Sequence, residues 1–291
     1  MIAPTRPPSW DENMRRRVLE SPQIHPTAMI DPTARIEAGV VIEPYTIVGR
    51  DVSIGEETRV GPFTVIGEHT TIGPRNRIYH HASVGTESQD LKFSGEESYL
   101  IIGEQNIIRE YATLNRATGA GEATRVGNRN IFMAYSHLAH NSVVGDNCVI
   151  ANAAEIGGLV VVEDWAILGG LAAIHQFCRI GAYSIVGAGS KVVQDVPPFL
   201  LADGHPVRPH GLNLVGLRRR GFTREEIREI QLAYDIVYSR SLRVEEAISH
   251  LREQFPTSPQ VAQIISFLEQ AERGIIRPRK RKMLCSPTGK K

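Results

Sequence analysis

Residues 42–67 read IEPYTIVGRDVSIGEETRVGPFTVIG, and an aliphatic side chain returns at every sixth position from Ile42 to Ile66. The same spacing runs from Ile24 to Val192. Of the 29 positions in that span whose number is a multiple of six, all hold Ile, Val, Leu or Phe except Asp90, Glu96 and Ala120. A period of six fits the strand period of two but not the helical period of 3.6, so it excludes an amphipathic helix. Internal repetition of this kind predicts a solenoid.

We number the slots of each hexad from its aliphatic residue. The second slot is often glycine, and 13 of the 26 glycines of the chain occupy it, which predicts a recurrent backbone bend there. The fifth slot is usually Ala, Ser, Thr or Cys, which predicts that it faces the interior. Each hexad is long enough for one short strand and one turn, and such units bury their aliphatic residues only by stacking, at about 4.8 Å per strand.

These hexads resemble those of the hexapeptide acyltransferases. The resemblance implies a left-handed parallel β-helix, in which three hexads form one triangular coil of about 18 residues and positions 18 apart lie above one another. The hand comes from the resemblance, since a period alone does not set it. The sequence thus predicts an all-β triangular prism followed by helices.

The chain divides into four predicted parts. Residues 1–21 form an N-terminal extension, and 22–196 form the β-helix, with outward loops near 86–99 and 116–125 where the aliphatic row fails. Residues 197–275 form an α-helical domain, with N-caps predicted at Thr223 and Ser258 and a helix stop at Gly274. A basic, disordered tail is predicted for residues 276–291.

The composition limits the function. The chain has 291 residues and a formal net charge of +1, which gives no support for nucleic-acid binding. No apolar run approaches the ~20 residues of a transmembrane helix, and the N-terminus lacks the apolar core of a signal peptide. Three cysteines fit a reducing compartment better than a disulfide framework. We therefore expect a cytoplasmic protein.

Two histidines in YSHLAHNSVVGDN, residues 135–147, are candidates for chemistry. The 18-residue rule places Gly158 and Gln176 in one column with His140, on the side where both loops leave the coil. Loops, an imidazole and a glycine backbone on one edge favour a functional site. A metal site needs three or four converging ligands, and no column of histidines forms within one chain, so we expect no metal. Histidines that are merely hydrogen-bonded at corners are the plainer alternative.

Six strings, in order along the chain, carry a closer resemblance. They are ESQDLKFSGE (87–96), NRATGAGEATRVGNRN (115–130), SHLAHN (136–141), GGLAAIHQFCRIGA (169–182), QDVPPFLLADG (194–204) and LNLVGLRRRGF (212–222). Together they resemble the family of UDP-N-acetylglucosamine 3-O-acyltransferases that begin lipid A synthesis, over residues 22–275. The resemblance implies transfer of a 3-hydroxyacyl group from the phosphopantetheine of acyl carrier protein, without a further cofactor, by a homotrimer with sites between subunits.

The resemblance also implies roles for individual residues. It makes His140 the general base, consistent with an imidazole that titrates near neutral pH, and it makes the N–H of Gly158 the oxyanion donor. A cysteine nucleophile is disfavoured, because Cys148 and Cys178 occupy inward fifth slots. Ala188 matches the residue that sets acyl-chain length. The substrate contacts implied are Gln89, Asp90, Lys92, His137, His175, Gln176, Asn213, Arg219 and Arg220, with guanidinium groups suited to a diphosphate.

The chain departs from the family pattern at three positions. Asn141 follows the base where Asp is common, so orientation rather than charge is the role left to it. Leu159 replaces a histidine and Val215 an acidic residue, which weakens the implied nucleotide contacts. Three alternatives remain: a related N-acyltransferase, disfavoured by LNLVGLRRRGF, a zinc hydratase on the same fold, and a non-catalytic scaffold.

Overall fold

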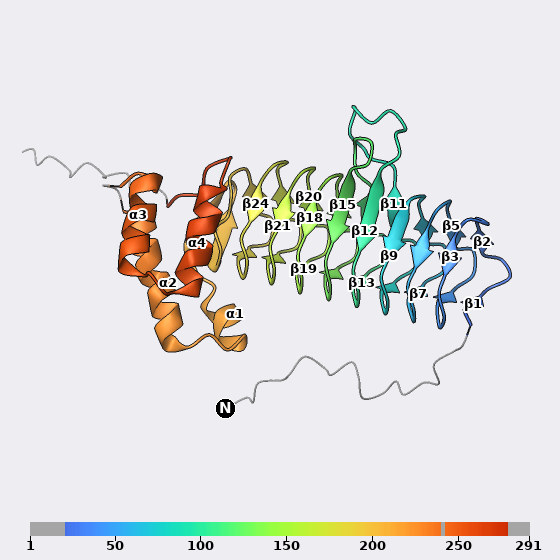
Figure 1. The fold of residues 1–291 in the computed structure, drawn as a ribbon, viewed down its shortest axis with the longest axis horizontal. Coiled ribbons are helices and arrows are strands. Elements are labelled where there is room, and N and C mark those ends of the chain that lie inside the picture. The colour runs from blue at the N-terminus through green and yellow to red at the C-terminus, as the bar shows by residue number, and fades with distance from the viewer. Residues whose placement is uncertain (1–20, 240–241, 279–291) are drawn as a thin grey trace, which may run out of the picture.

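The computed structural model describes residues 21–239 and 242–278. Short parallel strands follow one another around three faces of a prism, with helices at its C-terminal end (Figure 1). The predicted N-terminal extension, apart from Ser21, and the predicted tail beyond Pro278 lie outside the described residues.

Each face of the prism is one sheet, and every third strand belongs to the same sheet. Sheet A is formed by β1 (Gln23–Ile24), β4 (Val41–Ile42), β7 (Arg59–Val60), β10 (Arg77–Ile78), β13 (Ile107–Ile108), β16 (Ile131–Phe132), β19 (Val149–Ile150), β22 (Ile167–Leu168), β25 (Ile185–Val186), β27 (Leu200–Gly204) and β28 (Val207–Leu212). Sheet B is formed by β2 (Met29–Ile30), β5 (Ile47–Val48), β8 (Val65–Ile66), β11 (Ser83–Thr86), β14 (Thr113–Asn115), β17 (His137–Leu138), β20 (Glu155–Ile156), β23 (Ala173–Ile174) and β26 (Lys191–Val192). Sheet C is formed by β3 (Arg35–Ile36), β6 (Ser53–Ile54), β9 (Thr70–Ile72), β12 (Tyr99–Ile102), β15 (Ala123–Val126), β18 (Val143–Val144), β21 (Val161–Val162) and β24 (Arg179–Ile180).

The first and fifth slots fill the interior, as predicted. First-slot residues such as Ile54, Leu114 and Val186 are fully buried, and so are fifth-slot residues such as Thr58 and Ala154. Each strand spans the sixth and first slots and each turn the third and fourth, so third-slot side chains lie at the edges of the prism. The predicted fold class, a parallel β-helix with hexapeptide repeats followed by helices, is confirmed.

The second-slot glycines do not mark the bend that the sequence predicted. The left-handed backbone conformation lies two positions later, in the fourth slot, at non-glycine residues such as Tyr45 (φ 58°) and Phe63 (φ 56°). The glycines are required by stacking instead, because a Cβ at Gly61 would lie 2.7 Å from the backbone nitrogen of His80 in the next coil. Carbon cannot approach nitrogen so closely without a shift of the backbone, so glycine lets adjacent coils meet.

Asparagines carry the repeat through the interior of the edge between sheets C and A. Asn76, Asn106 and Asn130 are completely buried. The side-chain oxygen of each accepts the backbone N–H of the next residue in the column, at 2.7–2.9 Å, and each Nδ2 donates to carbonyls of the turns. The buried amides are thereby paired, which removes the penalty of burying a polar group.

The two predicted loops leave the coil between sheets B and C, at what we name the B–C edge. The first loop (87–98) joins β11 to β12, and the second loop (116–122) joins β14 to β15; both rise from the same side of the prism (Figure 1). Val84 pairs with Leu114 and Leu114 with Leu138, so the repeat there is 30 and then 24 residues. The prediction that Val84, Ile102 and Ala120 share one face was wrong, because the loops export whole hexads from the coil.

The C-terminal end begins with strands rather than helices. β27 joins sheet A beside β25, and β28 pairs antiparallel with β27, although the sequence assigned these residues to the helical domain. The helices are α1 (Leu214–Arg219), α2 (Arg224–Val237), α3 (Val244–Gln254) and α4 (Pro259–Glu269). Thr223 and Ser258 cap α2 and α4 as predicted, but α4 ends at Glu269, before the predicted stop at Gly274.

Ile275 and Ile276 return the chain to the prism. Ile275 bridges to Asp195, and Ile276 is 1% exposed within the core of the β-helix. The sequence assigned Ile276 to a disordered tail, so the packed structure extends further than predicted. A β-branched pair after a polar helix end was the signal available for this contact.

Candidate functional site

The B–C edge brings His140 and Gly158 into contact. Both are third-slot residues in turns, one after β17 and the other after β20, and the N–H of Leu159 donates to the carbonyl of His140 at 3.0 Å. A Cβ added to Gly158 would lie 2.6 Å from Cε1 of His140. The imidazole therefore rests on the glycine, and any larger residue there would displace the ring.

The imidazole of His140 is confined but reachable. Its side chain is 13% exposed, and Nδ1 lies 2.9 Å from Oδ1 of Asn141. Nε2 lies 3.9 Å from Oδ2 of Asp90, which the first loop brings over the edge. The ring thus has one nitrogen tied to its neighbour and the other facing the space beneath the loop.

The backbone N–H of Gly158 is available as a donor. Among the described residues it donates to no protein acceptor, and it lies at the turn that carries the His140 ring above it. Gly158 is itself buried. A pre-placed N–H beside an imidazole can stabilise an oxyanion while the imidazole moves a proton.

His137 lies in strand β17 rather than at the corner where the sequence placed it. Its Nδ1 is 2.7 Å from Oγ1 of Thr113, with Thr113 and Glu155 as its partners in the strands on either side. Burial, with a smaller contribution from the nearby His140, lowers the pKa of His137, and the carboxylate of Glu155 opposes this only partly. His137 is therefore neutral near pH 7 and can exchange hydrogen bonds.

The other predicted contacts on this edge are open to solvent. Gln89 and Lys92 are exposed on the first loop, and the N–H of Lys92 donates to Oδ1 of Asp90 at 3.1 Å. His175 and Gln176 are exposed one coil beyond Gly158, and Nδ1 of His175 lies 3.0 Å from the carbonyl of Gln176. The structure thus gathers these four residues around His140.

The predicted nucleotide-binding residues lie on a different edge, between sheets C and A. Asn213 is 6% exposed, caps α1 through Gly216 and donates Nδ2 to the carbonyl of Tyr183 at 2.9 Å. The guanidinium of Arg220 lies 4.8 Å from the centre of the Trp165 ring, and this burial lowers the pKa of Arg220. Arg219, next to it at the end of α1, is exposed.

Ala188 lies on the third edge, between sheets A and B, where it is exposed in the turn after β25. Within one chain, therefore, the structure brings together His140, Gly158, Asp90 and their neighbours. It does not bring Asn213, Arg219, Arg220 or Ala188 to them.

Arg116 is a residue of the site that the sequence did not reveal. It is 3% exposed, pairs with Glu68 at 3.0 Å and Glu87 at 3.7 Å, and lies over the ring of Phe93. It thus ties the first loop to the coil. The signal was its place two residues after Leu114, as His140 follows Leu138, but the 24-residue repeat at the second loop hid this match.

The cysteines of the β-helix are unsuited to catalysis. Cys148 and Cys178 are completely buried, and burial raises the pKa of their thiols to about 12 and about 11. A thiolate is the nucleophilic form, so neither thiol is reactive near neutral pH. Within residues 21–239 and 242–278, no three His, Cys, Asp or Glu side chains gather in a way that could hold a metal.

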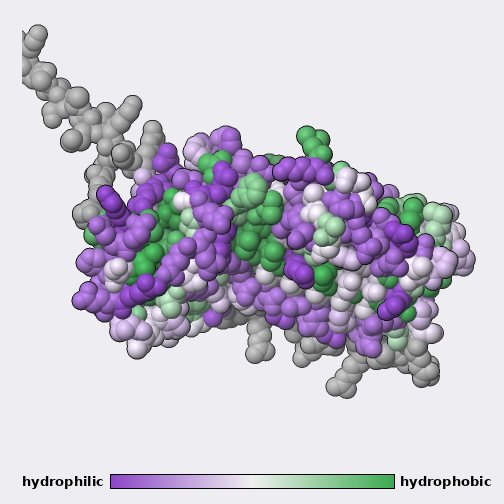
Figure 2. All heavy atoms as spheres, turned by 45° about the horizontal axis from the view of Figure 1, so that its top comes forward, coloured by the Kyte–Doolittle hydropathy of each residue, from purple (hydrophilic) through white to green (hydrophobic). Residues whose placement is uncertain are grey.

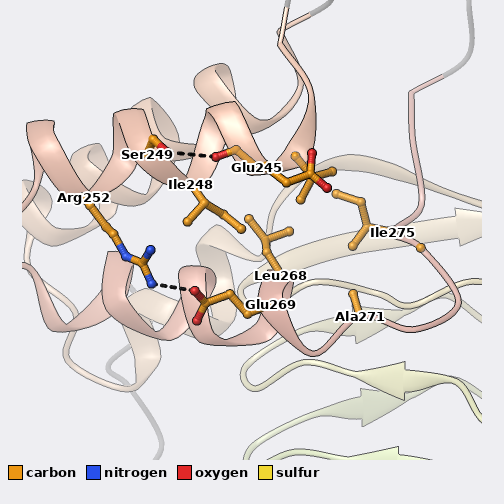
Figure 3. Close-up of a pocket in the computed structure, with 10 residues that line it drawn as sticks. Glu245, Ile248, Ser249, Arg252, Leu268, Glu269, Ala271 and Ile275 are labelled. Atoms are coloured by element: carbon orange, nitrogen blue, oxygen red, sulfur yellow. Dashed lines mark hydrogen bonds and ion pairs between the residues drawn. The ribbon is translucent and has the colours of Figure 1, made fainter.

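The largest depression lies among the helices rather than at the B–C edge. It has a volume of about 630 Å³ between α3 and α4, with Ile248, Leu268 and Ile275 on its floor (Figure 3). Arg252 on α3 pairs with Glu269 on α4 across its rim at 2.5 Å. It holds none of the residues predicted for the site, and none of the helices described could span a membrane.

Comparisons with known proteins agree with this geometry. Residues 195–276 match the family described as UDP N-acetylglucosamine O-acyltransferase, domain 2, and residues 33–67, 51–86 and 123–158 match the bacterial transferase hexapeptide repeats. The acyl-[acyl-carrier-protein]–UDP-N-acetylglucosamine O-acyltransferase of Stenotrophomonas maltophilia is 46% identical over 259 residues, covering 88% of this chain and 98% of its own. That of Halorhodospira halophila is 47% identical over 256 residues, covering 88% and 99%.

Solved structures are similar over the same span. The UDP-N-acetylglucosamine O-acyltransferase of Moraxella catarrhalis has a TM-score of 0.84 at 41% identity, covering 87% of this chain and 99% of its own. That of Francisella novicida has a TM-score of 0.86 at 34% identity, covering 89% and 95%. The chain belongs to the UDP-N-acetylglucosamine O-acyltransferase family, so the family predicted from the sequence is confirmed.

Proposed function

We propose that the protein transfers a 3-hydroxyacyl group from acyl carrier protein to the 3-hydroxyl of UDP-N-acetylglucosamine, the first step of lipid A biosynthesis. Family membership supports the substrates and the class of reaction. The observation that carries the proposal is the His140 imidazole resting on Gly158 at the edge where both loops emerge.

In the proposed mechanism His140 is the general base. Nε2 accepts the proton of the sugar 3-hydroxyl while the oxygen attacks the thioester carbonyl. The N–H of Gly158 stabilises the oxyanion of the tetrahedral intermediate. The carbon–sulfur bond then breaks, and the leaving phosphopantetheine thiolate takes the proton back from His140. No other cofactor is required.

We propose direct transfer rather than an acyl-enzyme. An acyl-cysteine would need an exposed thiolate, and Cys148 and Cys178 are buried with raised pKa values. The buried thiols therefore support attack by the sugar hydroxyl itself.

Six further residues are proposed substrate contacts. Each lies around the space beneath the first loop or one coil beyond it, where polar side chains can bind the sugar and the hydroxyacyl group. They are Gln89, Asp90, Lys92, His137, His175 and Gln176. The neutral imidazole of His137 suits a sugar hydroxyl, which both donates and accepts.

We propose that the complete site is shared between copies of the chain in a homotrimer. Asn213, Arg219 and Arg220, proposed for the nucleotide, and Ala188, proposed to limit the acyl chain, lie on other edges than His140. A second copy can present those edges to the first. The outward residues of sheet A include Ile107, Ile131 and Val149, an apolar row suited to such contact, and Figure 2 shows apolar patches on the otherwise polar prism.

An assay with UDP-N-acetylglucosamine and 3-hydroxyacyl carrier protein tests the proposal, with wild type compared with His140→Ala. We expect transfer by wild type and a loss of about 10²–10⁴-fold in the variant. Use of the 3-amino sugar instead would favour the related N-acyltransferase, and activity that depends on bound zinc would favour the hydratase. Full activity of His140→Ala would remove His140 from the mechanism, and no transfer by wild type would leave a scaffold.

A further inference from the structure

The side-chain amide of Asn141 is held by the backbone of Thr118 on the second loop. The N–H of Thr118 donates to Oδ1 of Asn141 at 2.9 Å, and Nδ2 of Asn141 donates to the carbonyl of Thr118 at 3.0 Å. A backbone N–H only donates and a carbonyl only accepts, so these two bonds allow one orientation of the amide. The flip ambiguity of an asparagine does not arise here.

The fixed amide determines which nitrogen of His140 carries the proton. Oδ1 of Asn141 lies 2.9 Å from Nδ1 of His140, and an amide oxygen can only accept. Nδ1 must therefore be the donor, which leaves the lone pair of the neutral ring on Nε2. Nε2 is the nitrogen on the side of Asp90, beneath the first loop.

The plainer explanation is that Asn141 serves only as the corner residue, with its φ of 57°. Asparagine tolerates this left-handed conformation well. However, Leu159 and Leu171 occupy the same slot with φ 60°, and Trp165 does so with φ 62°. The corner itself therefore does not require an amide.

A further hydrogen bond links this arrangement to the first loop. Oγ1 of Thr118 lies 2.6 Å from Oγ of Ser88, which in turn accepts the N–H of Asp90 at 3.1 Å. The loop that carries Asp90 is thus joined, through Ser88, Thr118 and Asn141, to the ring of His140. Both loops touch the amide or the residue that holds it.

We propose that Asn141 is a positioning residue: the second loop fixes its amide, and the amide keeps His140 with the proton on Nδ1 and the lone pair on Nε2. This rests on the proposed function for its catalytic meaning, because only the lone pair on Nε2 can accept the proton of a hydroxyl beneath the first loop. An uncharged amide provides orientation without placing a carboxylate beside the ring.

Nitrogen-15 NMR of the histidine side chains tests the tautomer without any substrate. The spectrum would be recorded at about pH 8, where an ordinary imidazole is neutral, with His140→Gln to assign the signal. We expect the proton of His140 on Nδ1 in wild type and a mixture of tautomers in Asn141→Leu, whose corner conformation is that of Leu159. A proton on Nε2 in wild type, or an unchanged tautomer in Asn141→Leu, would overturn the proposal.

Kinetics then tests the consequence. We expect Asn141→Leu to lower kcat about 100-fold, the order seen for a misplaced catalytic group, with little change in KM. Asn141→Asp should recover part of kcat and move the acid limb of the rate profile to higher pH, because a carboxylate stabilises the imidazolium. The matched control is Ser94→Ala in the same loop, whose hydroxyl bonds only Glu96.

The outcomes of the two tests separate the two proposals. Unchanged kcat in Asn141→Leu with an altered tautomer would overturn the positioning role. A wild type that fails to transfer the acyl group, with the tautomer as expected, would reject the proposed function and leave the structural assignment of Asn141 intact.

Discussion

His80 and His140 occupy the same third slot of the repeat, yet their surroundings differ completely. His80 lies on the A–B edge, exposed, with its ring against the edges of His81 and Tyr111 at 5.4 and 6.0 Å. His140 lies on the B–C edge, against Gly158, beneath Asp90 and bonded to Asn141. The repeat supplies the position of a side chain, whereas the neighbouring coil and the loops decide what it can do.

The A–B edge has a regular order of its own. Tyr45, Phe63, His81, Tyr111 and Tyr135 stack along it with ring centres 4.9–5.2 Å apart. Such contacts stabilise the stack of coils by burying aromatic faces. The histidines of this edge thus have packing partners, while His140 has a donor, a carboxylate and a buried glycine.

The largest expected effect comes from exchanging the histidines of the two edges for glutamine. His140→Gln should lower kcat by about 10²–10⁴-fold, since the proton acceptor is lost. His80→Gln should leave kcat within a factor of about two, because no proposed substrate contact touches it. Equal losses in both variants, measured by acyl transfer, would show that the difference between the edges has no catalytic meaning.

A smaller but still large effect is expected at the glycine. Gly158→Ala would push its Cβ into the His140 ring and should lower kcat about 100-fold, as a displaced catalytic group does. Gly170→Ala is the matched control, since Gly170 is a third-slot glycine on the A–B edge and its Cβ would lie 3.2 Å from the carbonyl of Asn152. Melting temperatures of both variants show whether the coil is intact, and full activity in Gly158→Ala would contradict the contact.

A moderate effect is expected on stability in acid, through His137 beside the B–C edge. The pKa of His137 is lowered in the folded protein, so the unfolded chain takes up this proton first as the pH falls below about 6.5. Its contribution to stability is complete above that pH and is lost as the pH drops toward the lowered value. His137→Gln should therefore reduce the loss of stability between pH 7.5 and pH 5, measured by denaturant unfolding; an unchanged loss would contradict the shift.

The smallest effect is expected from the buried cysteines. Cys148→Ala with Cys178→Ala should leave kcat within a factor of about two, since alanine fills the same slot at Ala166 and neither thiol contacts the B–C edge site. In a Cys285→Ser background, the folded protein should not react with a thiol reagent, and the denatured protein should react at two positions. A rate loss of a hundredfold would instead support an acyl-cysteine.

Much of the fold follows from the sequence because the repeat is strict. The first slot specifies the interior aliphatic residues, and the fifth slot specifies the small interior ones, so the sheets and their inward faces were predicted correctly. The register across the loops was not, because 12 and then 6 residues leave the coil without disturbing the period of six. The hairpin β27–β28 was missed, since its residues break the repeat and pair antiparallel.

The candidate site was predictable only in part, for the same reason. His140, Gly158 and Gln176 share a column with a spacing of 18, which the sequence shows directly. Arg116, Ser88 and Thr118 depend on contacts across the loops, 20 to 50 residues apart, that no local pattern encodes. Whether Arg220 meets the same substrate depends on a second copy of the chain.

The most direct test is a crystal structure with UDP-N-acetylglucosamine bound. We expect the 3-hydroxyl oxygen about 3 Å from Nε2 of His140, beneath the first loop, because a general base must reach the proton that it accepts. A sugar bound on another edge, or one whose 3-hydroxyl faces away from His140, would contradict the account.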